Sequence, residues 1–163
     1  AGMSWDPARD EAAGEQCRAF GAAGIMRLPG RLRISWQDDT TLKVETDTGT
    51  QTRLLAFRPG PAPAEPSWQG QSAAQWNVPG RSLQVVTTNL KPGYVRRNGA
   101  PYSGKAVVTE YWEMRTLPNK VQWLTITTKV DDPTYFTRPY ITSSDFKKLA
   151  GADGWSPTPC STK

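Results

Sequence analysis

The sequence feature that most constrains this chain is the alternation of apolar and polar side chains in short runs bounded by turn residues. A period of two is typical of β-strands that bury one face, and it does not fit an amphipathic helix. The pattern recurs along most of the 163-residue chain and predicts about eight strands. We expect these strands at residues 31–37, 40–47, 50–57, 72–78, 81–90, 105–115, 121–130 and 140–146.

The connections indicate how the strands pair. Short turns at 47–49, 79–80 and 117–120 predict antiparallel neighbours, because antiparallel strands can be joined by tight hairpins. Residues 58–70 contain four prolines and are expected to form a long connection, since proline is excluded from central strands. The chain is therefore predicted to be all-β, with an antiparallel meander. We expect the meander to close into a lipocalin-like β-barrel, with a β-sandwich as the alternative.

The two ends of the chain frame this predicted barrel. Residues 1–30 are expected to form an irregular N-terminal arm with one short helix, for which Asp6 and Pro7 supply N-terminal signals. Residues 31–146 form the predicted barrel, and residues 147–163 a C-terminal tail. A chain of this length suits one domain with a hydrophobic core.

Cys17 and Cys160 lie near opposite ends of the chain and are its only cysteines. Because the chain also lacks histidine, the usual zinc ligand sets are missing, and we expect neither a metal nor a cofactor. If the two cysteines pair, the disulfide ties back a tail that would otherwise fray. A disulfide favours an oxidising compartment, so we expect a periplasmic or secreted protein whose signal peptide has been removed.

The net charge of +5 bears on the partners of this chain. Its basic residues are scattered in short pairs such as Arg96 and Arg97, whereas nucleic-acid-binding proteins gather them on one element. We therefore expect no nucleic-acid partner, while a mild preference for anionic ligands stays open. No apolar run approaches the roughly 18 residues of a membrane span. The expected partner is a small-molecule ligand or substrate, and the oligomeric state is left open.

The lack of histidine also limits the chemistry available to the chain. It excludes a Ser-His-Asp triad, a Cys-His pair and an imidazole base. The glycine-rich motifs that bind nucleotide phosphates are missing too. Any catalysis must then rest on carboxylates, tyrosine, lysine or arginine.

Glu110 is the most informative carboxylate. Alternation in the strand expected at 105–115 places it on the more apolar face, between Val108 and Trp112. A carboxylate on an apolar barrel face is costly unless it is paired or protonated. Glu110 is therefore a candidate acid, base or ligand-binding group. The alternative is a salt bridge to a buried arginine that ties strands together.

A second carboxylate candidate, Asp132, precedes Pro133. Adjacent carboxylates before a proline are typical of an Asx-type turn, in which their oxygens accept hydrogen bonds from backbone N–H groups. The alternative is that Asp132 faces the cavity or pairs with Arg138. Arg138 is also a candidate ligand-binding residue. It precedes Pro139, so its backbone is expected to be extended.

The chain holds seven tryptophans, and most are expected in the core because large aromatics dominate small β cores. Trp112 and Trp123 lie inside predicted strands and are candidates to line a ligand pocket. Trp123 shares its face with Thr125 and Thr127. Such a face suits a ligand cavity and a solvent-facing surface equally.

The segment 89–104, NLKPGYVRRNGAPYSG, is unusually long for a connection between two adjacent strands. It contains two Pro/Asn-Gly turn signals, so we expect it to be ordered and to lie at one rim of the barrel. Tyr94 and Tyr102 are candidate proton donors. Arg96 and Arg97 are candidate ligand-binding groups, since a guanidinium can hold developing negative charge.

Several stretches resemble a broad, largely uncharacterised group of small secreted bacterial proteins. They are SWQG (67–70), TTNLKPGYVRRNGAPYSGKAVVTEYW (87–112), VDDPTYFTRPY (130–140) and PTPC (157–160). The group's signatures are an Arg-Arg-Asn-Gly loop, a Thr-Glu strand, an Asp-Asp-Pro corner and a C-terminal cysteine. The resemblance covers about residues 17–160.

The resemblance implies export and supports a pairing of Cys17 with Cys160. It names no reaction. It also implies that one set of residues occupies the group's signature positions: Arg96, Arg97, Asn98, Gly99, Glu110, Asp132 and Pro133.

Three functions compete at this point. The first is a secreted or periplasmic β-barrel that binds a small, partly aromatic or anionic molecule. The second is a cofactor-free isomerase, lyase or cyclase, in which Glu110 or Asp132 transfers a proton and Tyr94 or Tyr102 donates one. The third is a surface interaction module.

Overall fold

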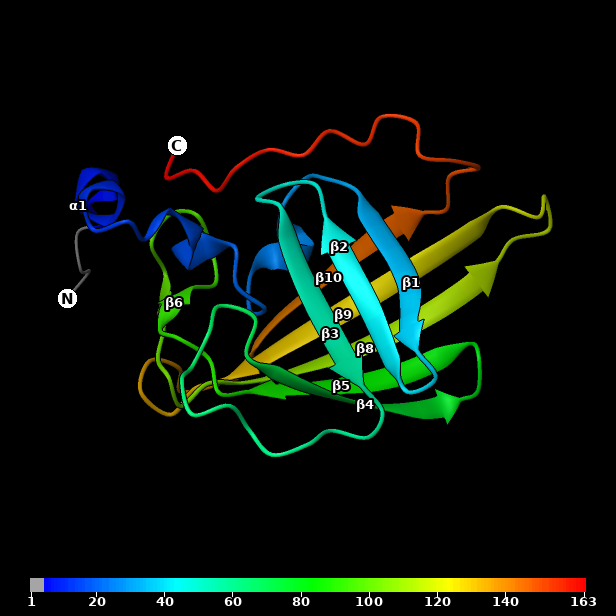
Figure 1. The fold of residues 1–163 in the computed structure, drawn as a ribbon, viewed down its shortest axis with the longest axis horizontal. Coiled ribbons are helices and arrows are strands. Elements are labelled where there is room, and N and C mark those ends of the chain that lie inside the picture. Colours follow the sequence, from blue (N-terminus) through cyan, green and yellow to red (C-terminus); the bar gives the residue numbers. More distant parts are fainter. Residues whose placement is uncertain (1–4) are drawn as a thin grey trace.

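The computed structural model of the chain describes residues 5–163 and is built around one curled β-sheet, a half-barrel (Figure 1). Eight strands form this sheet in the order β1-β2-β3-β4-β5-β8-β9-β10. Each predicted strand overlaps one observed strand. The strands are β1 Leu32–Asp38, β2 Thr41–Thr46, β3 Gln51–Ala56, β4 Gln71–Val78, β5 Ser82–Thr88, β8 Val107–Thr116, β9 Gln122–Asp131 and β10 Tyr140–Lys147.

The sheet is mixed, which corrects the expected antiparallel meander. β3 and β4 run parallel, with Leu55 opposite Ser72, while the other neighbours are antiparallel. The proline-rich connection 57–70 brings the chain back so that β4 begins beside the last residues of β3 and continues in the same direction. The strand order also leaves β1 and β10 as unpaired edges. The curled sheet is therefore a half-barrel and not the closed barrel that was expected.

One face of the sheet, here called the inner face, carries the core. Residues directly opposite each other on paired strands share a face, so the register defines this set from strand to strand. Its central side chains are fully buried; they include Val44, Leu55, Val85 and Ile126. Burying such a side chain stabilises the fold by roughly 1.5–3 kcal/mol.

The N-terminal arm covers part of the inner face. Its elements are α1 Pro7–Ala12 and two 3-10 helices, η1 Gln16–Ala19 and η2 Ile25–Arg27. Phe20, Ile25 and Met26 are buried against the inner face. The sequence signals for the helix are confirmed, because the Asp6 carboxylate accepts hydrogen bonds from the N–H groups of Ala8 and Arg9 at 3.1 and 3.3 Å.

The C-terminal tail connects the two edge strands. It leaves β10 and passes β1, where the Arg33 guanidinium lies 4.2 Å from the centre of the Trp155 ring. Thr158 then bridges Thr48 in the β2–β3 turn. The predicted disulfide between Cys17 and Cys160 is confirmed, with the two Cα atoms 5.1 Å apart. Figure 1 shows the tail returning to the side of the molecule where α1 lies.

The segment 89–104 is ordered, as predicted. It contains the two-residue strands β6 Gly93–Tyr94 and β7 Pro101–Tyr102, which pair with each other. Its buried Val95 and Tyr102 join a second core cluster with Ala22 and Ala23 of the N-terminal arm. The segment therefore packs against the arm.

Gly99 shows why the Arg-Arg-Asn-Gly loop at residues 96–99 needs a glycine. Its φ of 82° lies in the left-handed region, and Trp5 packs so closely that a β-carbon at position 99 would collide with it.

Within residues 5–163, no helix is long and apolar enough to span a bilayer.

Candidate functional site

Glu110 lies at the centre of the inner face and is fully buried, as the alternation predicted. Its two carboxylate oxygens accept hydrogen bonds from the Arg53 guanidinium, at 2.9 Å from Nη1 and 2.6 Å from Nη2. The same guanidinium lies 3.4 Å from the Thr87 hydroxyl, which in turn lies 2.7 Å from the Ser72 hydroxyl. The salt bridge to a buried arginine, left open by the sequence, is thus present, and it occupies both oxygens of Glu110.

Arg53 is a residue that the sequence reasoning missed. A signal existed, because alternation in the strand at 50–57 places Arg53 on the same face as the buried Leu55. An arginine and a glutamate on the apolar faces of two strands need each other as partners. A role of Glu110 in proton transfer stays a prediction.

Asp132 is buried just after β9 and forms the expected turn. It accepts hydrogen bonds from the Ser103 N–H at 2.5 Å, the Ser103 hydroxyl at 2.8 Å and the Thr134 N–H at 2.9 Å. Burial alone would raise the pKa of Asp132, but these hydrogen bonds outweigh it and hold the pKa below its ordinary value. Asp132 thereby fastens the segment 89–104 to the end of β9. Among the described residues it forms no ion pair with Arg138, whose side chain is exposed.

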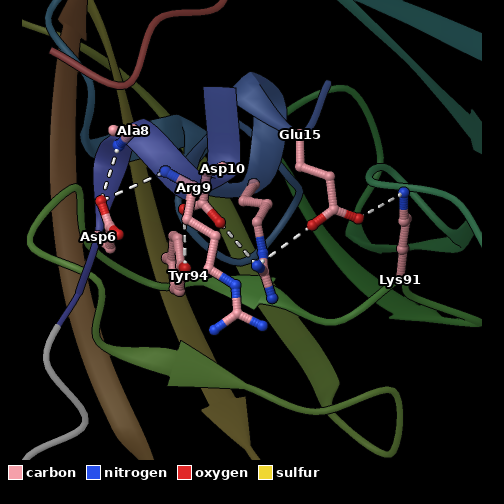
Figure 2. Close-up of polar contacts among 8 residues, drawn as sticks. Asp6, Ala8, Arg9, Asp10, Glu15, Lys91 and Tyr94 are labelled. Atoms are coloured by element: carbon pink, nitrogen blue, oxygen red, sulfur yellow. Dashed lines mark hydrogen bonds and ion pairs between the residues drawn. The ribbon is translucent and has the colours of Figure 1, made fainter. Parts of the chain in front are cut away.

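Tyr94 belongs to a polar cluster under α1, which Figure 2 shows. Its hydroxyl donates to the buried Asp10 carboxylate at 2.9 Å. Asp10 also pairs with Arg18 at 2.8 Å, and Glu15 lies 3.2 Å from Arg18 and 3.3 Å from Lys91. We call these five residues the α1 cluster. It links the N-terminal arm to the segment 89–104.

The electrostatics of the α1 cluster favour a structural role, in which the cluster holds the N-terminal arm to the segment 89–104. Burial, with the hydrogen bond to Asp10, raises the pKa of Tyr94, so its phenol stays protonated as a donor. Burial opposes the charge of Arg18, but its hydrogen bond to Asp10 raises the pKa of that guanidinium. The small space beside the cluster, which Arg97 also lines, measures about 10 Å³. A space of that size holds about one water molecule, which is too small for a substrate.

The remaining predicted residues of the segment 89–104 lie apart from Glu110. The Tyr102 hydroxyl is buried with no hydrogen-bond partner among residues 5–163, and burial raises its pKa. Arg96 Nε donates to the Tyr140 hydroxyl at 2.6 Å, and the Arg97 guanidinium lies 5.8 Å from the centre of the Phe20 ring. Of the predicted site residues, Tyr94 and Arg97 line the same small space beside the α1 cluster.

Trp112 and Trp123 lie on opposite faces of the sheet. Trp112 is on the inner face, 4% exposed, opposite Ile126. Trp123 is on the outer face, opposite Arg115 on one side and Lys147 on the other. A ligand on the inner face therefore cannot contact Trp123, and Trp112 is part of the core.

The inner face also carries an aromatic row that the sequence did not predict. Trp36 and Phe57 have ring centres 5.7 Å apart, and Phe57 stacks on Trp76 at 5.2 Å. The register places Trp36 opposite the core residue Leu42, so the row continues the core. Yet Trp36 is 54% exposed and Trp76 37%. We call Trp36, Phe57 and Trp76 the aromatic row.

The aromatic row lies at the end of the half-barrel away from the N-terminal arm. Trp36 and Trp76 stand beside the β1–β2 and β4–β5 hairpins, whereas the arm packs with the segment 89–104 at the other end. Between these ends the inner face is closed by its own side chains. The row is thus an exposed apolar surface on the inside of a curved sheet.

Comparisons of this chain with protein-family models, curated proteins and solved structures found no match. Within residues 5–163, no group of three Cys, Asp or Glu side chains is arranged to hold a metal ion.

Proposed function

We propose that this protein binds a small apolar molecule with a planar aromatic ring system, and that the ligand stacks on the aromatic row. The observation that carries the proposal is the exposure of Trp36 and Trp76 on the inner face, where Phe57 is tilted against Trp36 and stacked on Trp76. Exposed indoles leave apolar area in water that a ligand could bury, at about 25 cal/mol for each Å².

The packing of these rings pre-organises the aromatic row for a planar ligand. Phe57 lies between the two indoles and contacts both, and aromatic side chains have few torsions to immobilise. Little conformational entropy is then lost when a ligand binds, which favours affinity. Offset stacking between rings adds roughly 0.5–1.5 kcal/mol for each pair.

The size of the row favours a small molecule over a protein partner. From their exposed fractions, Trp36 and Trp76 together leave roughly 200 Å² of indole surface in water. A stable protein interface buries about 800 Å² on each partner. The surface interaction module is therefore the weaker proposal.

The wider setting agrees with a binding role outside the cytoplasm. The Cys17–Cys160 disulfide is consistent with an oxidising compartment. The proposed binding mode is lipocalin-like in one respect, because the ligand would lie on the inside of a curved sheet. Because Arg53 occupies both oxygens of Glu110, the buried carboxylate supports the fold more readily than proton transfer.

Equilibrium dialysis with 2-ethylnaphthalene tests the proposal, using the wild-type protein and the variants Trp36→Ala and Trp76→Ala. We expect each variant to weaken binding about tenfold or more, since it removes a stacking surface. The matched control is Trp123→Ala, which removes an indole from the outer face and should leave the Kd unchanged. Equal Kd values for the wild type and both row variants would contradict the proposal.

A further inference from the structure

We propose that a single chloride-sized anion binds in the small space beside the α1 cluster, held by N–H groups of Trp5, Arg18 and Arg97. This site lies apart from the aromatic row and does not depend on the proposed function. Its ligand class is the small monatomic anions. Such an ion would fasten the N-terminal arm to the segment 89–104 and to the C-terminal tail.

Arg18 has one edge of its guanidinium unused. Its Nη1 contacts the carboxylates of Asp10 and Glu15, at 2.8 and 3.2 Å. Among residues 5–163, its Nε is buried without a hydrogen-bond partner, and Nη2 forms no hydrogen bond or ion pair either. N–H groups of Nε and Nη2 point from the same edge of the planar guanidinium, and such an edge binds anions with two parallel hydrogen bonds. The Arg18 side chain is 29% exposed and lines the small space, so an ion can reach it.

Trp5 supplies a second donor without an acceptor. Its indole Nε1 is buried and has no hydrogen-bond partner among residues 5–163. Trp5 and Arg18 line the same small space. Arg97 lines it as well, and its guanidinium forms no ion pair within the described part of the chain. Native proteins pair nearly all buried polar groups, so two buried donors beside one space indicate a missing acceptor there.

Neither carboxylate of the α1 cluster is free to act as that acceptor. Asp10 uses one oxygen for Arg18 and the other for the Tyr94 hydroxyl. Glu15 likewise directs one oxygen to Arg18 and the other to Lys91. Figure 2 shows each carboxylate between its two partners. The unused donors therefore need an acceptor from outside the chain.

The charges around the space also favour an anion. Three positive side chains, Arg18, Lys91 and Arg97, stand against two negative ones, Asp10 and Glu15, which leaves a surplus of one positive charge. A bound chloride would neutralise that surplus. Because the donors are buried, this attraction is screened by salt less than an attraction at the open surface.

The size of the space decides between kinds of anion. Its volume of about 10 Å³ holds about one water molecule. A chloride ion is only slightly larger than water, whereas acetate and sulfate are several times larger. Water would also need acceptors for its own hydrogens, while chloride only accepts and so matches a space lined by donors. The hydroxyls of Ser161 and Thr162, which line the space too, can turn to donate to the ion.

Urea denaturation at constant ionic strength tests the proposal, with sodium chloride exchanged stepwise for sodium gluconate. Constant ionic strength removes the general effect of screening, and gluconate is too large for the space. Raising chloride from about 10 to about 100 mM should increase the folded-to-unfolded ratio at a fixed urea concentration about threefold or more, because the ion binds only the folded state.

Variants locate the effect. Trp5→Phe and Arg97→Gln each remove a donor, so the increase in the folded-to-unfolded ratio should fall to less than about half of its wild-type size. The matched control is Trp123→Phe, which changes an indole on the outer face and should keep the full increase.

The indole N–H of Trp5 gives a direct readout that needs no variant. Its peak in the ¹H–¹⁵N spectrum can be assigned through NOEs to Gly99, against which the ring packs. Chloride should move this peak downfield until the site is saturated, and the same concentration of sodium acetate should not. The indole peak of Trp123 should stay in place with both salts.

Each result supports or contradicts the site. A folded-to-unfolded ratio that is the same in chloride and gluconate would show that only water fills the space. A chloride effect that persists undiminished in both Trp5→Phe and Arg97→Gln would place the ion elsewhere. An equal shift of the Trp5 peak with acetate would contradict selection by size. None of these results bears on ligand binding at the aromatic row, where the Kd for 2-ethylnaphthalene should be the same in chloride and gluconate.

Discussion

Arg53 and Glu110 join two strands that are not neighbours, since β4 and β5 lie between β3 and β8 in the sheet. The pair therefore crosses the inside of the curve and ties its two sides together. Both side chains are almost completely buried, at 1% and 0% exposure. Removing one partner would leave the other charge buried without compensation.

The first prediction concerns this pair. Glu110→Gln or Arg53→Met should lower the free energy of unfolding by about 3–5 kcal/mol, measured by urea denaturation. The double variant Arg53→Met/Glu110→Leu should recover much of that loss, because no buried charge remains. The exposed pair Arg81–Glu113, with N and O 4.0 Å apart, is the control, and Glu113→Gln should cost less than about 1 kcal/mol. Equal costs for Glu110→Gln and Glu113→Gln would contradict a structural role.

The second prediction concerns the disulfide, which closes a sequence separation of 143 residues. Cys17→Ala/Cys160→Ala should lower the free energy of unfolding by roughly 2–5 kcal/mol, because the open chain gains conformational freedom when it unfolds. Urea denaturation of the variant measures the loss, and a reducing agent should produce a similar loss in the wild type only. The expectation fails if reduction leaves the wild-type midpoint unchanged.

The third prediction concerns acid stability. The pKa of Asp132 is held below its ordinary value, so the folded state favours the carboxylate. Its contribution is present above the unfolded pKa of about 4 and is lost as the pH falls through the lower folded pKa. Asp132→Asn should therefore cost about 1–3 kcal/mol at neutral pH and progressively less toward pH 3.

Urea denaturation at pH 7, 5 and 3 follows this difference. Asp131→Asn is a matched control, since Asp131 lies partly exposed and pairs with Lys129 at the surface. A cost for Asp132→Asn that is the same at every pH would contradict the role of the ionised carboxylate.

The fourth prediction compares two tyrosines. Tyr102→Phe should leave stability unchanged or slightly raised at pH 7, since the buried hydroxyl has no partner within residues 5–163. Tyr94→Phe should cost roughly 1–3 kcal/mol, because it removes a hydrogen bond to the Asp10 carboxylate. Thermal and urea unfolding measure both.

The raised pKa of Tyr102 also predicts that the stability of the fold decreases at alkaline pH. Burial raises the pKa of Tyr102, so the folded state retains the proton after the unfolded state has lost it. Stability should then fall as the pH rises above about 10, and Tyr102→Phe should reduce that fall. An unaltered alkaline profile in Tyr102→Phe would show that this phenol does not limit stability.

The strands could be predicted because alternation reports which side chains share a face, and burial follows that alternation in β2, β5, β8 and β9. Strand direction is not contained in such a pattern. The parallel pair of β3 and β4 was therefore missed, as was the open half-barrel, which depends on whether the edges of β1 and β10 meet. Cys17 and Cys160 could be paired because the chain offers no other partner.

The candidate site was harder to predict because it depends on contacts between distant parts of the chain. Arg53 and Glu110 are 57 residues apart, and nothing local marks them as partners. The aromatic row combines residues from β1 and β4 with Phe57, the residue that follows β3. Asp132 and Gly99 instead hold the segment 89–104 in place, through Ser103 and Trp5.

The most direct test of ligand binding at the aromatic row is the set of intermolecular NOEs between 2-ethylnaphthalene and the labelled protein. We predict NOEs from the naphthalene protons to the rings of Trp36, Phe57 and Trp76. NOEs confined to Tyr111 and Trp123 on the outer face, or no NOEs at a saturating probe concentration, would contradict the account.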